Sequence, residues 1–244
     1  MVKDILPGTT SSNPSTFFVF NNEVHFSSRY TSNNLEIWKT DGTSSGTVIA
    51  TTSGCYDSNC NFHSVTEYNG SFYGGGHWNN NGREVLMYNS SGLSLLVDLS
   101  PGTRYSIPRM TNPSNFVVHD GWLWFLTGGN PYGTNGYCLY RSNGTAAGTT
   151  PFVCDTNKYG LELFNDELYF GRSANGKGYE LWKTDGTTSG TVMVKDINTG
   201  SGSALGNQYG SARLFTSTDD YLYFSVKTGT TLSDEAIWRT DGTT

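Results

Sequence analysis

Short runs of apolar and polar residues alternate along the chain, and pairs of these runs are joined by tight polar turns. Asn-Gly, Asp-Gly and similar short Asn- or Asp-rich turns between such runs are typical of β-hairpins, because these turns match the twist of the flanking strands. Hairpin turns are predicted in this way at residues 21–23, 69–70, 120–121, 165–167 and 218–220. The chain is therefore expected to be all-β.

A second motif follows each hairpin. The segment EIWKTDGTSSGT at 36–47 returns as ELWKTDGTTSGT at 180–191, as AIWRTDGTT at 236–244 and, in weaker form, as CLYRSNGTAAGT at 138–149. The most divergent copy is LMYNSSGLSL at 86–95. Alignment on the aromatic residue gives a repeat about every 49 residues, the period of a repeated β unit, at Trp38, Tyr88, Tyr140, Trp182 and Trp238.

Each repeat predicts four antiparallel strands: the two hairpin strands, the strand with the aromatic residue, and a strand after the Asp-Gly-Thr turn. We therefore predict one five-bladed β-propeller domain over 1–244. The repeats are expected at approximately 2–47, 48–95, 96–150, 151–191 and 192–244.

The sequences at the two ends of the chain agree with a closed five-bladed propeller. The last repeat stops before its fourth strand, and residues 2–5 have the sequence VKDI that also occurs at 194–197 in the fourth repeat. The N-terminal strand is therefore expected to complete the last blade. Closure of the ring would remove the free sheet edges that promote aggregation.

The string ELWKTDGT at 180–187, with Gly-Thr at 190–191 and VKDI after it, resembles the ELWxxDGT repeat of large secreted bacterial and marine proteins. The match covers the first, fourth and fifth repeats well, the third moderately and the second poorly. The resemblance implies a secreted, propeller-like module and brings no shared catalytic chemistry. Five blades are also similar in number to those of the tachylectin lectins, which is an analogy of fold alone.

Composition and charge exclude some classes of binding partner. Glycine supplies 30 residues, only 15% of residues are charged, and the net charge is −6. The 15 basic residues form no run, which argues against nucleic acid as a partner. No apolar stretch is long enough for membrane insertion, and Met1 opens on charged and polar residues. Any export signal is therefore expected to have been removed; the alternative is that the chain is a domain of a longer protein.

Cysteines and glycosylation sequons point to an extracellular setting. Cys138 and Cys154 are expected opposite each other on the third and fourth strands of one blade, where they can form a disulfide. Cys55 and Cys60 then close the small loop GCYDSNC; the alternative is four free thiols. Asn-x-Ser/Thr sequons, which also arise by chance in such a sequence, begin in predicted turns at Asn69, Asn89 and Asn143.

Binding is expected on the longer connections between strands, because variable loops on a rigid scaffold usually carry it. These connections include 155–158 between the third and fourth blades. Aromatic and basic side chains among Asn, Ser and Gly suit a neutral polar ligand such as a sugar. The alternative is that they are ordinary loop residues. The candidate binding residues are Tyr30, Tyr56, Trp78, Arg104, Tyr105, Tyr132 and Tyr209.

Other repeated residues are assigned to the fold. The tryptophans at 38, 182 and 238 lie inside strands, so we interpret them as core between blades. Asp41, Asp185 and Asp241 could be imagined as metal ligands, but their Asp-Gly context indicates turn formation. The aspartates at 4, 98, 155 and 196 are interpreted as loop caps. No metal site and no cofactor are predicted.

Three functions remain open. The first is a secreted, non-enzymatic binding module for a glycan or another surface or matrix component, serving adhesion. The second is a structural unit that assembles with other copies of itself in a fibre or matrix. The third is a glycoside hydrolase, for which the innermost strands offer Glu67 and Glu162 as carboxylates. These two fall at positions of opposite parity, and we assign no catalytic residue.

Overall fold

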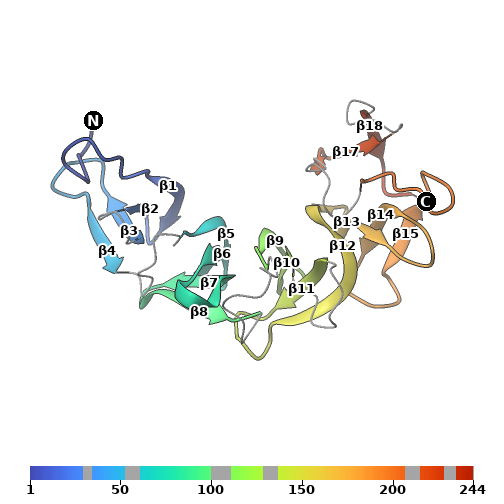
Figure 1. Ribbon diagram of the computed structural model, residues 1–244, viewed down its shortest axis with the longest axis horizontal. Helices are drawn as coiled ribbons and strands as arrows, with labels where there is room; N and C mark the ends of the chain where they lie inside the picture. The colour runs from blue at the N-terminus through green and yellow to red at the C-terminus, as the bar shows by residue number, and fades with distance from the viewer. Residues whose placement is uncertain are drawn as a thin grey trace. The chain divides into compact units, whose positions relative to one another are not determined.

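A computed structural model describes residues 1–29, 35–52, 61–99, 111–128, 137–206, 215–227 and 235–243. These residues form two compact units, Met1–Pro113 and Ser114–Thr244 (Figure 1). Both units are built from antiparallel sheets, and one turn of 3₁₀ helix, η1 (Asn79–Asn81), lies in the first. Among the described residues, no helix has the length and apolarity to cross a bilayer. The all-β prediction is confirmed.

The first unit contains two four-stranded sheets whose strands follow chain order, as predicted. We call the sheet of each repeat a blade. The first blade consists of β1 (Ser15–Phe20), β2 (Glu23–Arg29), β3 (Leu35–Thr40) and β4 (Val48–Thr52). The second consists of β5 (His63–Tyr68), β6 (Ser71–His77), β7 (Arg83–Asn89) and β8 (Gly92–Val97). Apolar side chains of both blades share one core, with Ile37, Phe62 and Leu86 fully buried in it.

In the second unit, the third and fourth blades share a strand. Their sheet is formed by β9 (Ser114–His119), β10 (Trp122–Thr127), β11 (Tyr137–Ser142), β12 (Thr150–Phe164), β13 (Glu167–Ser173), β14 (Tyr179–Thr184) and β15 (Val192–Lys195). The first part of β12 pairs with β11 and its last part pairs with β13. The last sheet has three strands, β16 (Phe215–Ser217), β17 (Leu222–Lys227) and β18 (Glu235–Thr240).

The shared strand corrects the prediction of a connection at 155–158. These residues lie inside β12, where the register shifts between Thr156 and Leu161. Asp155 and Gly160 adopt φ values of 63° and 86°, which bend the backbone without ending the strand. Glycine takes such a φ readily and aspartate tolerates it, so the chain changes blades without a loop.

The register also corrects the alignment of the second repeat. Trp38 lies opposite Phe26, and Trp182 lies opposite Phe170, the fourth residue after the hairpin turn in each case. The equivalent residue of β6 is Gly74, whose partner is Leu86 and not Tyr88. Gly74 has no room for a side chain of its own, because a Cβ on it would lie 2.6 Å from the His63 carbonyl oxygen. Alignment on the aromatic residue therefore displaced this repeat by two positions.

The repeated tryptophans are buried in two of three cases. Trp182 packs in a cluster with Trp124, Leu126 and Leu139 of the preceding blade, which confirms its assignment to the core between blades. Trp38 is buried against Phe26 and other residues of its own unit. Trp238 is 38% exposed and so departs from the prediction in this structure.

A closed ring is not confirmed. The structure has no strand over residues 2–5, and the last sheet has three strands. The N-terminal residues contact the first blade instead: Ile5 packs against Phe26 and Trp38, and Lys3 Nζ donates a hydrogen bond to the Thr47 carbonyl oxygen.

Candidate functional site

One glutamate recurs at the same place in three blades. Glu36, Glu84 and Glu180 lie at or near the start of β3, β7 and β14, and they are 5%, 1% and 0% exposed. A carboxylate is seldom buried this far unless hydrogen bonds compensate for the lost water. The burial therefore indicates a specific partner for each.

Glu180 holds the backbone of the connection after β15. Its Oε2 accepts hydrogen bonds from the amides of Ile197 (2.9 Å) and Asn198 (3.4 Å), and its Oε1 accepts one from the amide of Ala204 (3.1 Å). Ala204 is fully buried, next to Leu205 in the core shared with β17. One side chain thus fixes both ends of the segment 197–204.

Glu84 holds the start of the corresponding connection in the second blade, where its Oε2 accepts a 2.7 Å hydrogen bond from the amide of Leu99, just after β8. Neighbouring polar side chains reinforce this attachment. Asn81 Nδ2 donates to Asp98 Oδ2 at 2.8 Å. Arg83 Nη1 donates to Asn112 Oδ1 at 2.9 Å. The connection after β4, residues 53–60, lies outside the described residues.

Burial changes the acidity of these carboxyls. The pKa of Glu84 is raised to about 8, chiefly by burial and also by the nearby Asp98 charge, while the hydrogen bond from Leu99 acts in the opposite direction. Burial also raises the pKa of Glu180, while its three amide donors lower it. A raised pKa is also a feature of general acids, but here backbone amides occupy both carboxyl oxygens of Glu180 and Oε2 of Glu84. Their repetition in separate blades favours a role in holding loops.

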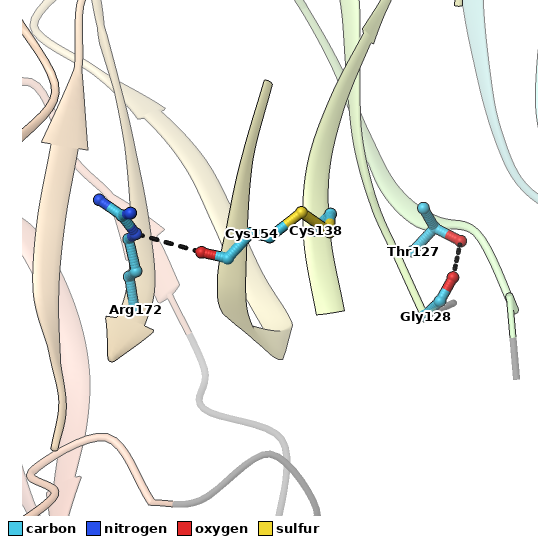
Figure 2. Close-up of a disulfide and its surroundings, with 5 residues drawn as sticks. All are labelled: Thr127, Gly128, Cys138, Cys154 and Arg172. Carbon is cyan, nitrogen blue, oxygen red and sulfur yellow. Dashed lines mark hydrogen bonds between the residues drawn. A yellow bond between two sulfur atoms is a disulfide. The ribbon is translucent and has the colours of Figure 1, made fainter. Parts of the chain in front are cut away.

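The third blade has a disulfide at the equivalent position. Cys138 lies opposite Thr127 of β10, as Glu180 lies opposite Arg172 of β13, and it bonds to Cys154 across β11 and β12 with a Cα–Cα distance of 4.0 Å (Figure 2). The predicted pairing is confirmed. A covalent link therefore replaces the buried carboxylate in this blade.

Arg172 connects the disulfide to the fourth blade. Its Nε donates a 3.2 Å hydrogen bond to the Cys154 carbonyl oxygen, as Figure 2 shows, and its guanidinium lies 4.8 Å from the centre of the Trp182 ring. Burial lowers the pKa of Arg172. On β10, Thr127 Oγ1 donates to the carbonyl oxygen of Gly128 at 3.0 Å (Figure 2).

These contacts define a loop edge, the edge of each blade from which the connections after its second and fourth strands leave. In the second blade it comprises 78–82 and 98–99, and in the fourth it comprises 174–178 and 196–206. Trp78 is the one predicted binding residue that the structure describes, and it lies there between β6 and η1. Its amide donates to the Gly82 carbonyl oxygen, and its partly buried ring packs on the core of the first unit. Trp78 is thus both a loop residue and a packing residue.

The other predicted binding residues lie outside the described residues: Tyr30, Tyr56, Arg104, Tyr105, Tyr132 and Tyr209. The same holds for Cys55 and Cys60. Their assignments stay predictions.

The opposite edge, which carries the hairpin turns and the Asp-Gly-Thr turns, is the turn edge. Here the aspartates act as predicted: Asp185 Oδ1 accepts from the amide (2.8 Å) and hydroxyl (2.7 Å) of Thr187, and Asp41 and Asp241 repeat this pattern. The hydroxyl and amide of Thr187 lower the pKa of Asp185. These aspartates are turn formers, and the described residues hold no group of His, Cys, Asp and Glu suited to a metal ion.

The sequon asparagines also lie at the turn edge. Asn69 and Asn143 are exposed, in the β5–β6 turn and in the turn after β11. Asn89 is half-buried at the end of β7. Asn143 Oδ1 accepts from Thr145 as an aspartate does in the other copies, so this asparagine forms the turn.

The carboxylates considered for hydrolysis lie in different units. Glu67 is exposed on β5 of the first. Glu162 is half-buried on β12 of the second, and its Oε1 accepts a 2.9 Å hydrogen bond from Ser217 Oγ.

The sequence prediction missed the buried glutamates. Their signal was present, since a glutamate opens both EIW at 36–38 and ELW at 180–182. The displaced alignment of the second repeat hid Glu84, and the third repeat has Cys138 instead. The position carries Glu in three repeats, Cys138 in the third and Ala236 in the fifth, so it can be recognised only once the strand register is known.

No protein-family model and no curated protein matches the chain. Among solved structures it is similar to an α-L-arabinofuranosidase from Clostridium thermocellum, at 15% identity and a TM-score of 0.40, over 96% of this chain and 92% of that chain. It is also similar to a gluconolactonase from Xanthomonas campestris, at 14% identity and a TM-score of 0.45, over 98% of this chain and 76% of that chain. A third similar structure is the polysaccharide lyase Uly1, at 13% identity and a TM-score of 0.47, over 93% of this chain and 57% of that chain. Likeness at these scores carries no argument about function.

Proposed function

We propose that the protein is an extracellular, non-enzymatic binding module that takes a neutral carbohydrate at its loop edge. The observation that carries this proposal is the anchoring of the loop roots. Glu84 and Glu180 fix the connections after β8 and β15, and the Cys138–Cys154 disulfide fixes β11 to β12. A rigid base under variable loops lowers the entropy cost of ordering them around a ligand.

The residue types on these loops suit a sugar. Aromatic rings stack on the apolar face of a pyranose, while amides and guanidinium groups meet its hydroxyls. The segments 53–60, 100–110, 129–136 and 207–214 contribute Tyr, Arg, Asn, Ser and Gly in different orders. Because these sequences differ from blade to blade, we expect one or two sites. A disulfide agrees with an extracellular location.

A glycan array with the purified chain tests the proposal. Binding of one glycan class, weakened by Tyr105→Ala or Tyr132→Ala and unchanged by Tyr221→Ala at the turn edge, would support it. Failure of every glycan class to bind above background would refute carbohydrate recognition.

We also propose that the ring closes through residues 2–5. Trp182 pairs with Met193 of β15, so the equivalent partner of Trp238 would be Met1. In the structure Trp238 and Ile237 are exposed, and a groove of about 330 Å³ lies between Trp238 on one side and Leu181 and Val194 on the other. A fourth strand with the sequence of residues 1–5 would cover these apolar groups.

The alternative, assembly into a fibre or matrix, follows from the same exposed strand if the fourth strand comes from another copy. The pair Asp4→Cys with Ala236→Cys separates the two, because these positions correspond to the native Cys154 and Cys138. A disulfide within the monomer supports closure, and disulfide-linked dimers or longer chains support assembly. Absence of any bond under oxidising conditions would contradict both.

A further inference from the structure

Two blades carry the same set of polar side chains at the turn edge. In the fourth blade, Lys183 Nζ lies 2.9 Å from Glu167 Oε2, and in the first, Lys39 Nζ lies 3.0 Å from Glu23 Oε2. An asparagine stands two residues before each glutamate, Asn165 and Asn21, respectively. The two sets are therefore equivalent by register and by residue type.

In the fourth blade this set holds the Asp-Gly-Thr turn of the next blade. Lys183 Nζ donates to the Gly242 carbonyl oxygen at 3.1 Å, and Asn165 Nδ2 donates to the Asp241 carbonyl oxygen at 3.2 Å. Tyr169 forms the floor, because a Cβ on Gly242 would lie 2.8 Å from its hydroxyl oxygen. Glycine is required at the tip of the turn for this close approach.

In the first blade the equivalent set carries no Asp-Gly-Thr turn, and the shorter β7–β8 turn lines one side of the site with Ser90, Ser91 and Gly92. The neighbouring strands β7 and β8 are joined by Ser90 and Ser91 alone, which replace the longer Asp-Gly-Thr or Asn-Gly-Thr connection of the other blades. A cleft of about 250 Å³ remains, which we call the turn-edge cleft, lined by Phe20, Asn21, Glu23, His25, Lys39 and Tyr88, among others.

The hydrogen-bond donors of the turn-edge cleft are available to a ligand. Within the described ranges, Lys39 Nζ donates only to Glu23, and the Asn21 side chain makes no hydrogen bond. The Glu23 and Lys39 side chains are 42% and 35% exposed. His25 is buried against Phe18, Phe20 and Tyr88, so it is held in place as Tyr169 is in the fourth blade.

We propose that the turn-edge cleft is a docking site for an Asp-Gly-Thr turn presented by a partner protein. The donors and the floor are those that hold such a turn elsewhere in this chain. The acceptors would be the two carbonyl oxygens of the Asp-Gly pair, received by Asn21 and Lys39. The turn arrives preformed, because its aspartate accepts from the threonine amide and hydroxyl, and so little entropy is lost on docking.

A backbone-cyclised peptide with the sequence TDGTTSGT of residues 184–191 is the probe, titrated into the full chain and followed by NMR. We expect perturbation of the amides of residues 20–25, 39 and 88–92, with a dissociation constant of about 1 mM for so few contacts. Lys39→Met removes a charge-assisted hydrogen bond and should weaken binding about tenfold. Methionine is tolerated there, since Met87 stands at the equivalent place in the second blade.

The controls decide between occupants. A peptide with Asp replaced by Ala loses its preformed turn and should bind more weakly, and Ser45→Ala, on an exposed turn of the first blade, should leave binding unchanged. Absence of perturbation, or equal binding by Lys39→Met, overturns the proposal. The proposal is also overturned if a monosaccharide perturbs the amide signals of the cleft and the peptide does not. A glycan array without binding would refute carbohydrate recognition and would not affect the docking proposal.

Discussion

Replacement of Glu180 by alanine should destabilise the second unit by about 3 kcal/mol. The carboxylate accepts hydrogen bonds from three backbone amides, and the amide of Ala204 is buried. A buried donor without an acceptor costs roughly 1–3 kcal/mol, and the part-buried amides of Ile197 and Asn198 add about 1 kcal/mol because water reaches them. Removal of a carboxyl whose pKa burial raises offsets part of this cost.

Guanidinium unfolding measures the total effect, and hydrogen exchange locates it. The amides of Ala204 and Ile197 should lose protection, while those of β10 and β11 should keep it at concentrations below the unfolding transition. Glu180→Gln retains one carbonyl acceptor and should lose less stability than Glu180→Ala. Glu67→Ala, which removes an exposed strand glutamate, is the matched control and should change stability by less than about 0.5 kcal/mol.

A loss below about 0.5 kcal/mol for Glu180→Ala, with Ala204 still protected, would refute the reasoning. It would mean that the connection after β15 keeps its conformation through its apolar contacts alone. Equal losses for Glu180→Ala and Glu67→Ala would count against it as well, because the buried hydrogen bonds would then contribute nothing specific.

Three further changes test other contacts. The pKa of Glu84 is raised from 4.5 to about 8 in the folded state, so between these pH values the folded state binds a proton that the unfolded state does not. The free energy of unfolding should therefore fall from about pH 5 to pH 8, by up to ~1.4 kcal/mol per pH unit. Urea titrations at several pH values measure this slope, and Glu84→Gln should remove it. Gly190→Ala places a Cβ 2.1 Å from Asp185 Oδ1 and should lower the unfolding free energy by about 1–3 kcal/mol, whereas Ser189→Ala should not. Paired Cys138→Ala and Cys154→Ala, with a sequence separation of 16, should cost about 3 kcal/mol by thermal unfolding, and an unchanged melting temperature would contradict this.

The hairpins and the Asp-Gly-Thr turns could be predicted because their signals are local. The turn dipeptides fix two neighbouring strands, and Asp185 acts on Thr187 two residues away. The pairing of Cys138 with Cys154 is also local, since a hairpin centred between them sets the register. Such features need only a few residues, all of which lie in one short segment.

Features that depend on distant partners were harder to predict. The Tyr88 alignment failed because the pairing with the preceding strand sets the equivalent position, and there Gly74 lies opposite Leu86. The connection expected at 155–158 failed because backbone bends at Asp155 and Gly160 let one strand serve two blades. Glu180 gives no local sign of its role, since its donors Ile197 and Ala204 belong to a connection after the next strand.

The exchange of glutamate for cysteine shows what the repeat position requires. A buried carboxylate holds flexible backbone by accepting several amides, but it costs desolvation and depends on pH. A disulfide at the same register needs only two strands at the right distance and carries no charge. The third blade can use it because β12 continues, with a bend, into the fourth blade and leaves no connection for a carboxylate to hold. The shared strand therefore accounts for the absence of the glutamate from the third blade.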